Sequence, residues 1–249
     1  MGYVQTASEA AKEYDKTLIA HATTLNQAKS AVKHGAGLLV HSVSDKEVDQ
    51  EFIEMAKGQG TIYTPTLIVG SGYMLAYRAA AGVANYPFDD PNKCVDPKTR
   101  QLLKEASQFS DHPAFSDSFM KRLKSFDPEQ DRMSKTALTN LKKMYDAGVP
   151  IAVGTDAGNP GTLHGPSIYE EMEAMQRAGI PAEDLIVMAT QNGARAMQRA
   201  DDFGTLEDGK FANLIILEND PSKDIANMRS ITQTMLQGKL MKIGDIAEK

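Results

Sequence analysis

The sequence predicts an α/β protein with a parallel sheet, and three observations support this fold class. Two strand–helix units follow one another with a repeat of 20 residues. The apolar run that opens each unit ends in a histidine, His21 in the first unit and His41 in the second. Two further apolar runs, at 61–69 and 151–153, are separated by stretches with helical periodicity. Strands that alternate with helices along a chain form parallel sheets.

The first unit follows a predicted helix at the start of the chain. Apolar and small side chains recur there at amphipathic helical spacing, namely Val4, Ala7, Ala11 and Tyr14. The run from Thr17 to Ala20 then predicts a strand, and the stretch from Leu25 to Lys33 predicts a helix that Gly35 ends. His34 falls at the C-terminus of that helix, where a positive charge is favourable.

The second unit repeats the pattern. Leu38 to Val40 predicts a strand. Ser44, with Glu47 three residues later, has the form of a capping box that opens a helix ending at Gly58. The inner face of this helix carries Val48, Phe52 and Met55. One more strand–helix unit is therefore expected to lie beside the first.

The remaining strands are predicted from apolar runs with breakers on either side. A third strand is expected from Thr61 to Val69. A fourth is expected from Ile151 to Val153, after a helix that Gly148 ends. The apolar face of that helix carries Ala137, Leu141 and Met144. Four strands of one parallel sheet are thus predicted.

A long polar stretch separates the third and fourth strands. From Ser71 to Arg132 the periodicity breaks, and five prolines interrupt the chain, at positions 87, 91, 97, 113 and 128. Such a length exceeds an ordinary connection. Two interpretations stand side by side: an active-site lid, or a solvated insertion without function, since surface loops accept insertions readily.

The last third of the chain is predicted to be helical and then β-like. Pro166 opens a helix whose buried face carries Ile168, Met172 and Met175, with the methionines as core filler. A helical hairpin is expected from Pro181 to Gln198. Two β-like segments follow, namely Asn213 to Leu217 and Ile231 to Leu236. They predict a small separate sheet.

Composition excludes several classes of protein. With 27 Lys and Arg against 33 Asp and Glu, the net charge is −6, which argues against a nucleic acid or an anionic membrane as main partner and favours a small-molecule substrate. Cys94 is the single cysteine, so neither an intrachain disulfide nor a Cys-rich zinc module can form. No apolar run reaches the roughly 20 residues of a membrane span. A cytoplasmic location is the default, and a periplasmic or secreted one applies if a leader precedes Met1.

Three candidate metal ligands follow strand ends. His21 and His41 come directly after neighbouring strands, and Asp156, within 154–158 (GTDAG), follows the fourth. Because the carboxyl ends of parallel strands meet at one rim, these side chains are expected to share a divalent metal ion. Zinc is the first choice, and manganese, iron and nickel accept the same ligand types. A lone histidine after a strand is more often structural; three candidates in equivalent positions favour a site.

Other candidates carry weaker signals. His164 lies eight residues past Asp156 on the same predicted rim loop, where it would bind a substrate carboxylate or carbonyl, with a loop-stabilising hydrogen bond as the alternative. His112, inside the insertion, is expected to be solvated. The glycine-rich stretch 154–161 lacks the GK[ST] ending of a phosphate loop, so nucleotide binding is disfavoured.

Several motifs together make the chain resemble the amidohydrolase superfamily, and within it the imidazolonepropionase-like and Xaa-Pro dipeptidase-like members. The motifs lie at 19–22 (IAHA), 40–42 (VHS), 64–66 (TPT), 154–158 (GTDAG), 164–165 (HG), 189–194 (ATQNGA) and 204–214 (GTLEDGKFANL). The resemblance covers nearly the whole chain. It implies that His21 and His41 bind the metal and that Asp156 binds metal and transfers the proton of the attacking water. The implied reaction is hydrolysis of a carbon–nitrogen bond in an amide, a cyclic amide or an Xaa-Pro dipeptide.

The resemblance also implies the fold. The four strands correspond to strands five to eight of a (β/α)₈ barrel, with 1–200 as the partial barrel and 71–132 as its helical or irregular insertion. Residues 201–249 correspond to the C-terminal strands of a small β-sandwich. The family's His-x-His pair and bridging lysine, which complete a site for one or two metal ions, have no counterpart in this sequence. The C-terminal half of the barrel is therefore expected without its N-terminal half.

A half-barrel has physical consequences. Four strands leave two open edges and an uncovered apolar face, so the chain is expected to need its missing half or self-association. Three explanations stay open: a partial sequence, which we favour, one part of a split protein, or a self-associating half-barrel. Little or no hydrolysis is expected from this chain alone. The alternatives to an enzyme fragment are a metal-free binding or assembly module and an open doubly wound sheet with an unrelated site.

Overall fold

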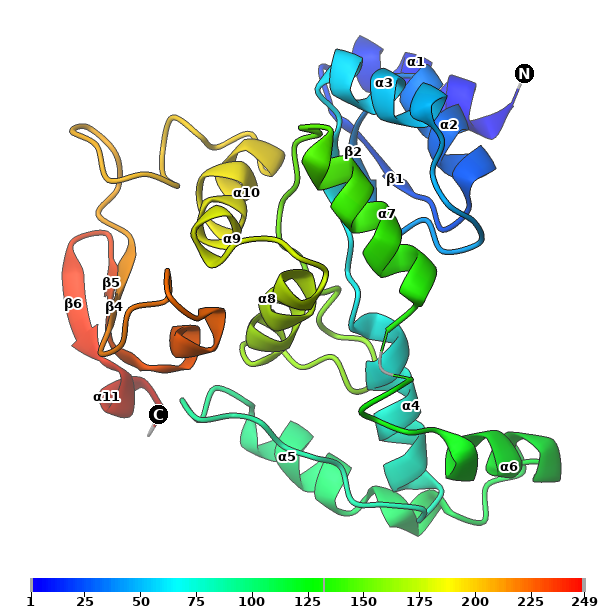
Figure 1. Ribbon diagram of the computed structural model, residues 1–249. Coiled ribbons are helices and arrows are strands. Elements are labelled where there is room, and N and C mark those ends of the chain that lie inside the picture. Colours follow the sequence, from blue (N-terminus) through cyan, green and yellow to red (C-terminus); the bar gives the residue numbers. More distant parts are fainter. Residues whose placement is uncertain (1, 132, 248–249) are drawn as a thin grey trace.

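The computed structural model describes residues 2–131 and 133–247. Its first part alternates helices and strands as expected (Figure 1). The elements in chain order are α1 (Tyr3–Glu13), β1 (Leu18–His21), α2 (Leu25–Lys33), β2 (Ala36–Val40), α3 (Gln50–Gln59) and β3 (Ile62–Thr64). Both predicted strand–helix units are confirmed, and His34 is the C-cap of α2, with its Nδ1 2.7 Å from the Ser30 carbonyl oxygen.

The three strands form one parallel sheet in the order β1-β2-β3. The predicted fourth strand joins only through a parallel bridge between Ile151 and Tyr63. Tyr63 N–H donates to the Pro150 carbonyl oxygen at 2.8 Å, and Ala152 N–H donates to the Tyr63 carbonyl oxygen at 3.1 Å. The order is sequential, without the reversal that a doubly wound sheet requires, so that alternative is disfavoured.

The outer edge of β1 is open. Among the described residues no strand pairs with this edge, and Ile19 on β1 is 57% exposed. Unpaired backbone groups beside an exposed isoleucine form a template for another strand. That the chain needs a partner stays a prediction, and the open edge of β1 is where such a partner would pair.

The predicted start and end of α3 are wrong. The helix begins after Asp49, whose side chain accepts from Phe52 N–H, and it ends at the left-handed Gly60 rather than at Gly58. The Ser44 capping box does not form because Asn140 holds the preceding loop: its side chain accepts from Val48 N–H at 2.8 Å and donates to the Val43 and Lys46 carbonyls, both at 2.9 Å. A hydrogen bond between residues 92 positions apart in the sequence thus overrides the local capping-box signal.

The predicted third strand is also too long. Only Ile62–Thr64 is strand, and the chain turns at Pro65 because proline has no N–H for the ladder. The apolar residues that follow lead into α4 (Val69–Ala80), so the helical periodicity continues past Ser71, where the sequence indicated a break. The rest of the insertion contains α5 (Pro97–Lys104), the 3₁₀ helix η1 (Ala106–Phe109) and α6 (Asp117–Ser125).

The main core lies between the parallel sheet and the helices around it. These helices include α2, α3, α7 (Lys135–Asp146), α8 (Ser167–Arg177) and α9 (Ala182–Ala189), and α10 (Gln191–Ala196) follows α9. Fully buried core side chains include Phe52, Leu141, Met144, Met172 and Met175. The methionine stripes are confirmed as core packing.

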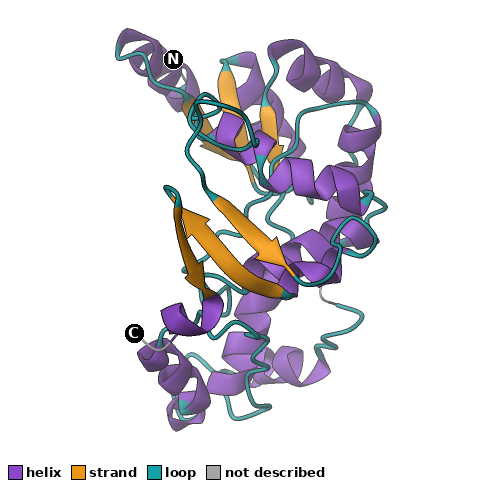
Figure 2. Cartoon of the chain, turned by 90° about the vertical axis from the view of Figure 1, so that its left-hand side faces the viewer, coloured by secondary structure: helices purple, strands orange, loops and turns teal. Residues whose placement is uncertain are grey.

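The C-terminal part forms a second, antiparallel sheet (Figure 2). Its elements are β4 (Leu214–Leu217), η2 (Ile225–Arg229), β5 (Ile231–Leu236), β6 (Lys239–Lys242) and α11 (Ile243–Ala247). The strands pair in the order β4-β5-β6, and none of their residues is buried. The sequence predicted the first two strands and missed β6, whose two lysines give it no apolar run.

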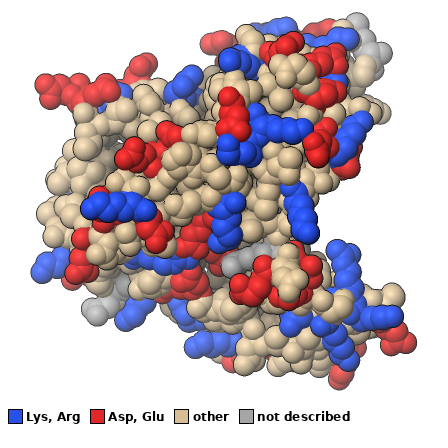
Figure 3. Space-filling view, viewed as in Figure 1, with Lys and Arg blue, Asp and Glu red and all other residues tan. Residues whose placement is uncertain are grey.

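The surface carries charges of both signs. On the face in Figure 3 the acidic and basic side chains are interspersed, and neither sign forms a continuous area. Within 2–131 and 133–247, no helix combines the length and apolar character that crossing a membrane requires.

Gly161 marks a close approach between α4 and the loop that follows Asp156. A methyl group there would lie 2.0 Å from the carbonyl oxygen of Gly72 in α4, and the φ of Gly161 is +75°. We expect Gly161→Ala to lower the free energy of unfolding by about 3 kcal/mol or more, because backbone must move on one side. Urea unfolding measures this loss.

Gly58 provides the matched control. It is exposed in the last turn of α3, and nothing lies within 4 Å of an added methyl group. Gly58→Ala should raise the free energy of unfolding by about 0.5–1 kcal/mol through helix propensity. Equal effects of the two substitutions would contradict the proposed backbone contact.

Candidate functional site

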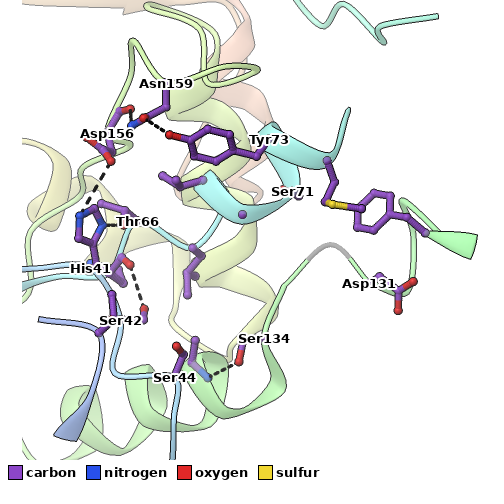
Figure 4. Close-up of a pocket in the computed structure, with 18 of the residues that line it drawn as sticks. His41, Ser42, Ser44, Thr66, Ser71, Tyr73, Asp131, Ser134, Asp156 and Asn159 are labelled. Carbon is purple, nitrogen blue, oxygen red and sulfur yellow. Dashed lines mark hydrogen bonds and ion pairs between the residues drawn. The ribbon is translucent and has the colours of Figure 1, made fainter. Parts of the chain in front are cut away.

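A cavity of about 770 Å³ opens at the carboxyl ends of the parallel strands (Figure 4). It lies beside the ends of β1, β2 and β3 and the loop after Ile151. Its walls come from strand ends, from the rim loops and from the insertion. Its lining includes His21, Thr23, His41, Ser42, Ser44, Thr66, Ser71, Tyr73, Arg122, Phe126, Asp131, Ser134, Asp156 and Asn159. All three predicted metal ligands therefore face one cavity.

The two imidazoles lie against each other. The ring centroids of His21 and His41 are 4.5 Å apart, and the rings meet edge to face at 71°. They come from the adjacent strand ends of β1 and β2, which pair in parallel register through His21 and Val40. The strand register therefore produces the juxtaposition that the sequence pattern predicted.

Thr66 orients His41. The Nδ1 atom of His41 lies 2.7 Å from Thr66 Oγ1, and this hydrogen bond leaves Nε2 directed at the cavity. Burial lowers the pKa of His41 below its usual range, the neighbouring His21 lowers it further, and Asp156 acts in the opposite direction. His41 is therefore neutral at pH 7, the form in which imidazole binds a metal ion.

Asp156 stands on the other side of His41. Its Oδ2 lies 3.9 Å from His41 Nε2, and its side chain is 38% exposed. Asn159 Nδ2 donates to the Asp156 carbonyl oxygen at 3.0 Å, and Tyr73 O–H donates to Asn159 Oδ1, as Figure 4 shows. The Asp156 carboxylate is thus accessible to water and substrate, while hydrogen bonds through Asn159 fix the backbone of Asp156.

Three residues around the cavity adopt left-handed backbone conformations without being glycine. Their φ angles are +77° for His41, +46° for Thr66 and +54° for Asp156. Such conformations are costly, and they cluster at functional sites because the surrounding structure must hold them. No local sequence pattern predicted these three backbone conformations.

The donor types suit a divalent metal ion, but they are not gathered as a finished ligand set. Two imidazoles and a carboxylate are the ligand types of many zinc sites, and the second nitrogen of His41 is held by a hydrogen bond, as in metal sites. Yet in the part of the chain that the structure describes, no group of three or more His, Cys, Asp or Glu side chains is placed to hold a metal ion. The rings of His21 and His41 touch edge to face, and Asp156 Oδ2 lies 3.9 Å from His41 Nε2.

The insertion borders the same cavity. Arg122, Phe126 and Asp131, from α6 and the segment after it, line it opposite the strand ends. Tyr73 of α4 reaches Asn159 on the rim loop. The insertion is therefore placed where a lid would lie, and the lid itself stays a prediction.

The other predicted candidates lie elsewhere. His164 is exposed and does not line the cavity, so its role toward substrate stays a prediction. His112 is exposed, as expected. The sequence reasoning missed Tyr73 and Asn159 as cavity residues; the TPT motif was the only signal that pointed near Thr66.

Comparison with known protein families gives one match over nearly the whole chain. The model of the amidohydrolase family matches residues 3–241. A 5-methylthioadenosine/S-adenosylhomocysteine deaminase of Moorella thermoacetica is 35% identical over 98 residues, which is 36% of this chain and 23% of that protein. An imidazolonepropionase of Porphyromonas gingivalis is 33% identical over 104 residues, 40% of this chain and 24% of that protein.

Solved structures show the same fold. A Xaa-Pro dipeptidase with methionine bound in its active site matches with a TM-score of 0.65 and 23% identity, covering 96% of this chain and 48% of that one. Molinate hydrolase matches with a TM-score of 0.67 and 20% identity, covering 99% of this chain and 47% of that one. The chain thus spans about half the length of these structures, and its mixed α/β fold is of their TIM-barrel type.

Proposed function

The chain belongs to the amidohydrolase family, and from that premise we propose that it supplies one side of a metal-dependent active site that hydrolyses a carbon–nitrogen bond in a small molecule. The observation that carries the proposal is the cavity that His21, His41 and Asp156 line at the strand ends, where the two imidazoles touch and Asp156 lies beside His41. The relatives named above support it, since a deaminase, an imidazolonepropionase and a dipeptidase all act on carbon–nitrogen bonds.

The proposed metal ligands are His21, His41 and Asp156. Zinc is the preferred ion because imidazole nitrogen with carboxylate oxygen is a common zinc ligand set. When bound, a divalent ion would polarise the substrate carbonyl and make water acidic enough to attack near neutral pH. With Nδ1–H of His41 donating to Thr66 Oγ1, the lone pair of Nε2 would stay available to a metal ion.

Asp156 is the proposed acid–base group. Its half-exposed carboxylate would accept a proton from the attacking water, whose oxygen adds to the carbonyl carbon. As the carbon–nitrogen bond breaks, the same carboxyl group would return the proton to the leaving nitrogen. One carboxylate then serves both steps, and the reaction consumes one water molecule.

We propose further that the chain acts as the C-terminal half of a barrel and needs the complementary half for turnover. The open edge of β1 and the exposed strands β4 to β6 support this proposal. Two histidines and one aspartate would hold a metal weakly without companions. Hydrolysis by this chain alone is therefore expected to be slight.

The competing function is a metal-free binding module. It is favoured by one observation, that no three-ligand group is assembled among the described residues. In that case the cavity would bind a small molecule without cleaving it. Metal binding separates the two functions.

We expect the purified chain, alone or with the complementary half, to bind close to one zinc ion in equilibrium dialysis against a fixed zinc concentration, and to lose this binding on His21→Ala with His41→Ala. The matched control is His34→Ala with His112→Ala, which removes two histidines outside the cavity. Substitution of both His21 and His41 should lower the zinc affinity by at least about 100-fold relative to the wild type. Retention of no metal under any condition would favour the binding module and contradict the proposal.

A further inference from the structure

Glu171 is a buried carboxylate that the proposed chemistry does not use. It lies on α8 with 0% exposure, and none of the ion pairs among the described residues includes it. Burial raises the pKa of Glu171 to about 8, while hydrogen bonds from backbone N–H groups act against that rise. A carboxylate in such a place is costly, so its contacts require an explanation.

Those contacts are two backbone N–H groups in the loop after β3. Leu67 N–H donates to Oε1 at 2.8 Å, and Ile68 N–H donates to Oε2 at 3.1 Å. Both donors stand just before α4, where backbone N–H groups lack helical partners and the helix dipole favours negative charge. Glu171 therefore fixes this loop through both of its oxygens.

The same loop holds the imidazole of the cavity. Thr66, the neighbour of Leu67, bonds His41 Nδ1 at 2.7 Å and is itself left-handed. Pro65 accepts a hydrogen bond from Ser42 Oγ at 2.9 Å, so the loop also holds the residue after His41. A continuous path of contacts thus runs from Glu171 through the loop to His41.

The geometry assigns to Glu171 the role of a positioning residue, which holds the loop at Leu67 and Ile68 so that Thr66 holds the His41 ring in one orientation through a fixed hydrogen-bond partner at Nδ1. Its relevance to catalysis rests on the proposed function, but the positioning itself does not. A carboxyl group suits this role because each of its two oxygens can accept from one of the two donors. A glutamine offers one acceptor and directs its NH₂ group at the other donor.

Nitrogen NMR of the histidine rings tests the inference in metal-free protein. At about pH 8 the His41 ring is neutral, and the shifts of its two nitrogens report the tautomer. We expect one dominant tautomer in the wild type. In Glu171→Gln and in Thr66→Ala the difference between the two shifts should fall to about half or less, because the ring loses its fixed partner.

Two controls separate positioning from stability. Leu141→Ala empties a fully buried core position on α7 and should lower the melting temperature while leaving the His41 shifts unchanged. The His34 ring, bonded within its own helix, should keep its shifts in every variant. Amide exchange at Leu67 and Ile68 should quicken by at least about 10-fold in Glu171→Gln.

A folded Glu171→Gln variant with wild-type His41 shifts would overturn the inference. If that variant does not fold, Glu171→Asp, which is one methylene shorter and cannot reach both donors, decides by the same readout. No metal or substrate is added, so failure of the metal proposal would leave this result intact. Conversely, a protein that binds zinc but shows no His41 change would contradict only the role of Glu171.

Discussion

Asp156→Asn is expected to lower kcat by about 10³-fold in a polypeptide that joins this chain to the complementary half of the barrel. The amide has the size of the carboxylate but cannot accept the proton of the attacking water. Asparagine also tolerates the left-handed backbone that position 156 requires, with its φ of +54°. The loss therefore reports chemistry rather than a backbone change. Steady-state hydrolysis of a small amide or Xaa-Pro dipeptide measures it.

Asp131→Asn is the matched control for this prediction. Asp131 is a second acidic residue that lines the cavity, on the insertion side rather than at the strand ends. Its side chain accepts from Asp127 N–H, a contact that an amide oxygen can also make. We expect a change in kcat of less than about 5-fold, since no proton transfer is assigned to it. Equal losses in both variants would refute the role of Asp156.

The second large effect concerns stability against pH. Unfolding returns the carboxyl group of Glu171 from a pKa of about 8 to its ordinary value of 4.5. Below pH 4.5 both states hold the proton, and above about pH 8 neither does. Between these values only the folded state holds it, so each unit of rising pH lowers the free energy of unfolding by about 1.36 kcal/mol. From pH 4.5 to about pH 8 the free energy of unfolding therefore falls by on the order of 5 kcal/mol.

Glu171→Gln removes this titration while keeping the shape of the side chain. Its free energy of unfolding should lie below that of the wild type at pH 5, and the gap should narrow toward pH 9. Urea unfolding at both pH values measures the gap. The lowered pKa of His41 works in the opposite direction, since it costs stability as pH falls. Burial of the ring is its largest cause and applies to both proteins, so this contribution largely cancels. A difference in the free energy of unfolding between wild type and Glu171→Gln that does not change with pH would contradict the raised pKa of Glu171.

Local spacing was sufficient for the alternation of elements and for the positions of the main candidates. Apolar runs that end in His21 and His41 placed both imidazoles at strand ends, and the parallel register brought them into contact. The GTDAG motif placed Asp156 at the same rim. These predictions succeeded because periodicity and breakers act over a few residues, and parallel strands align their carboxyl ends.

The orientation of those side chains came from contacts that no local pattern encodes. Asn140 holds a loop 92 residues away and moves the start of α3, and Glu171 holds the Thr66 loop across 104 residues. Hydrogen bonds of this range form only after the helices have packed on the sheet, since burial then obliges each backbone N–H to find a partner. The residue order of this chain therefore determined which groups reach the cavity, and the packing of α7 and α8 determined how they point.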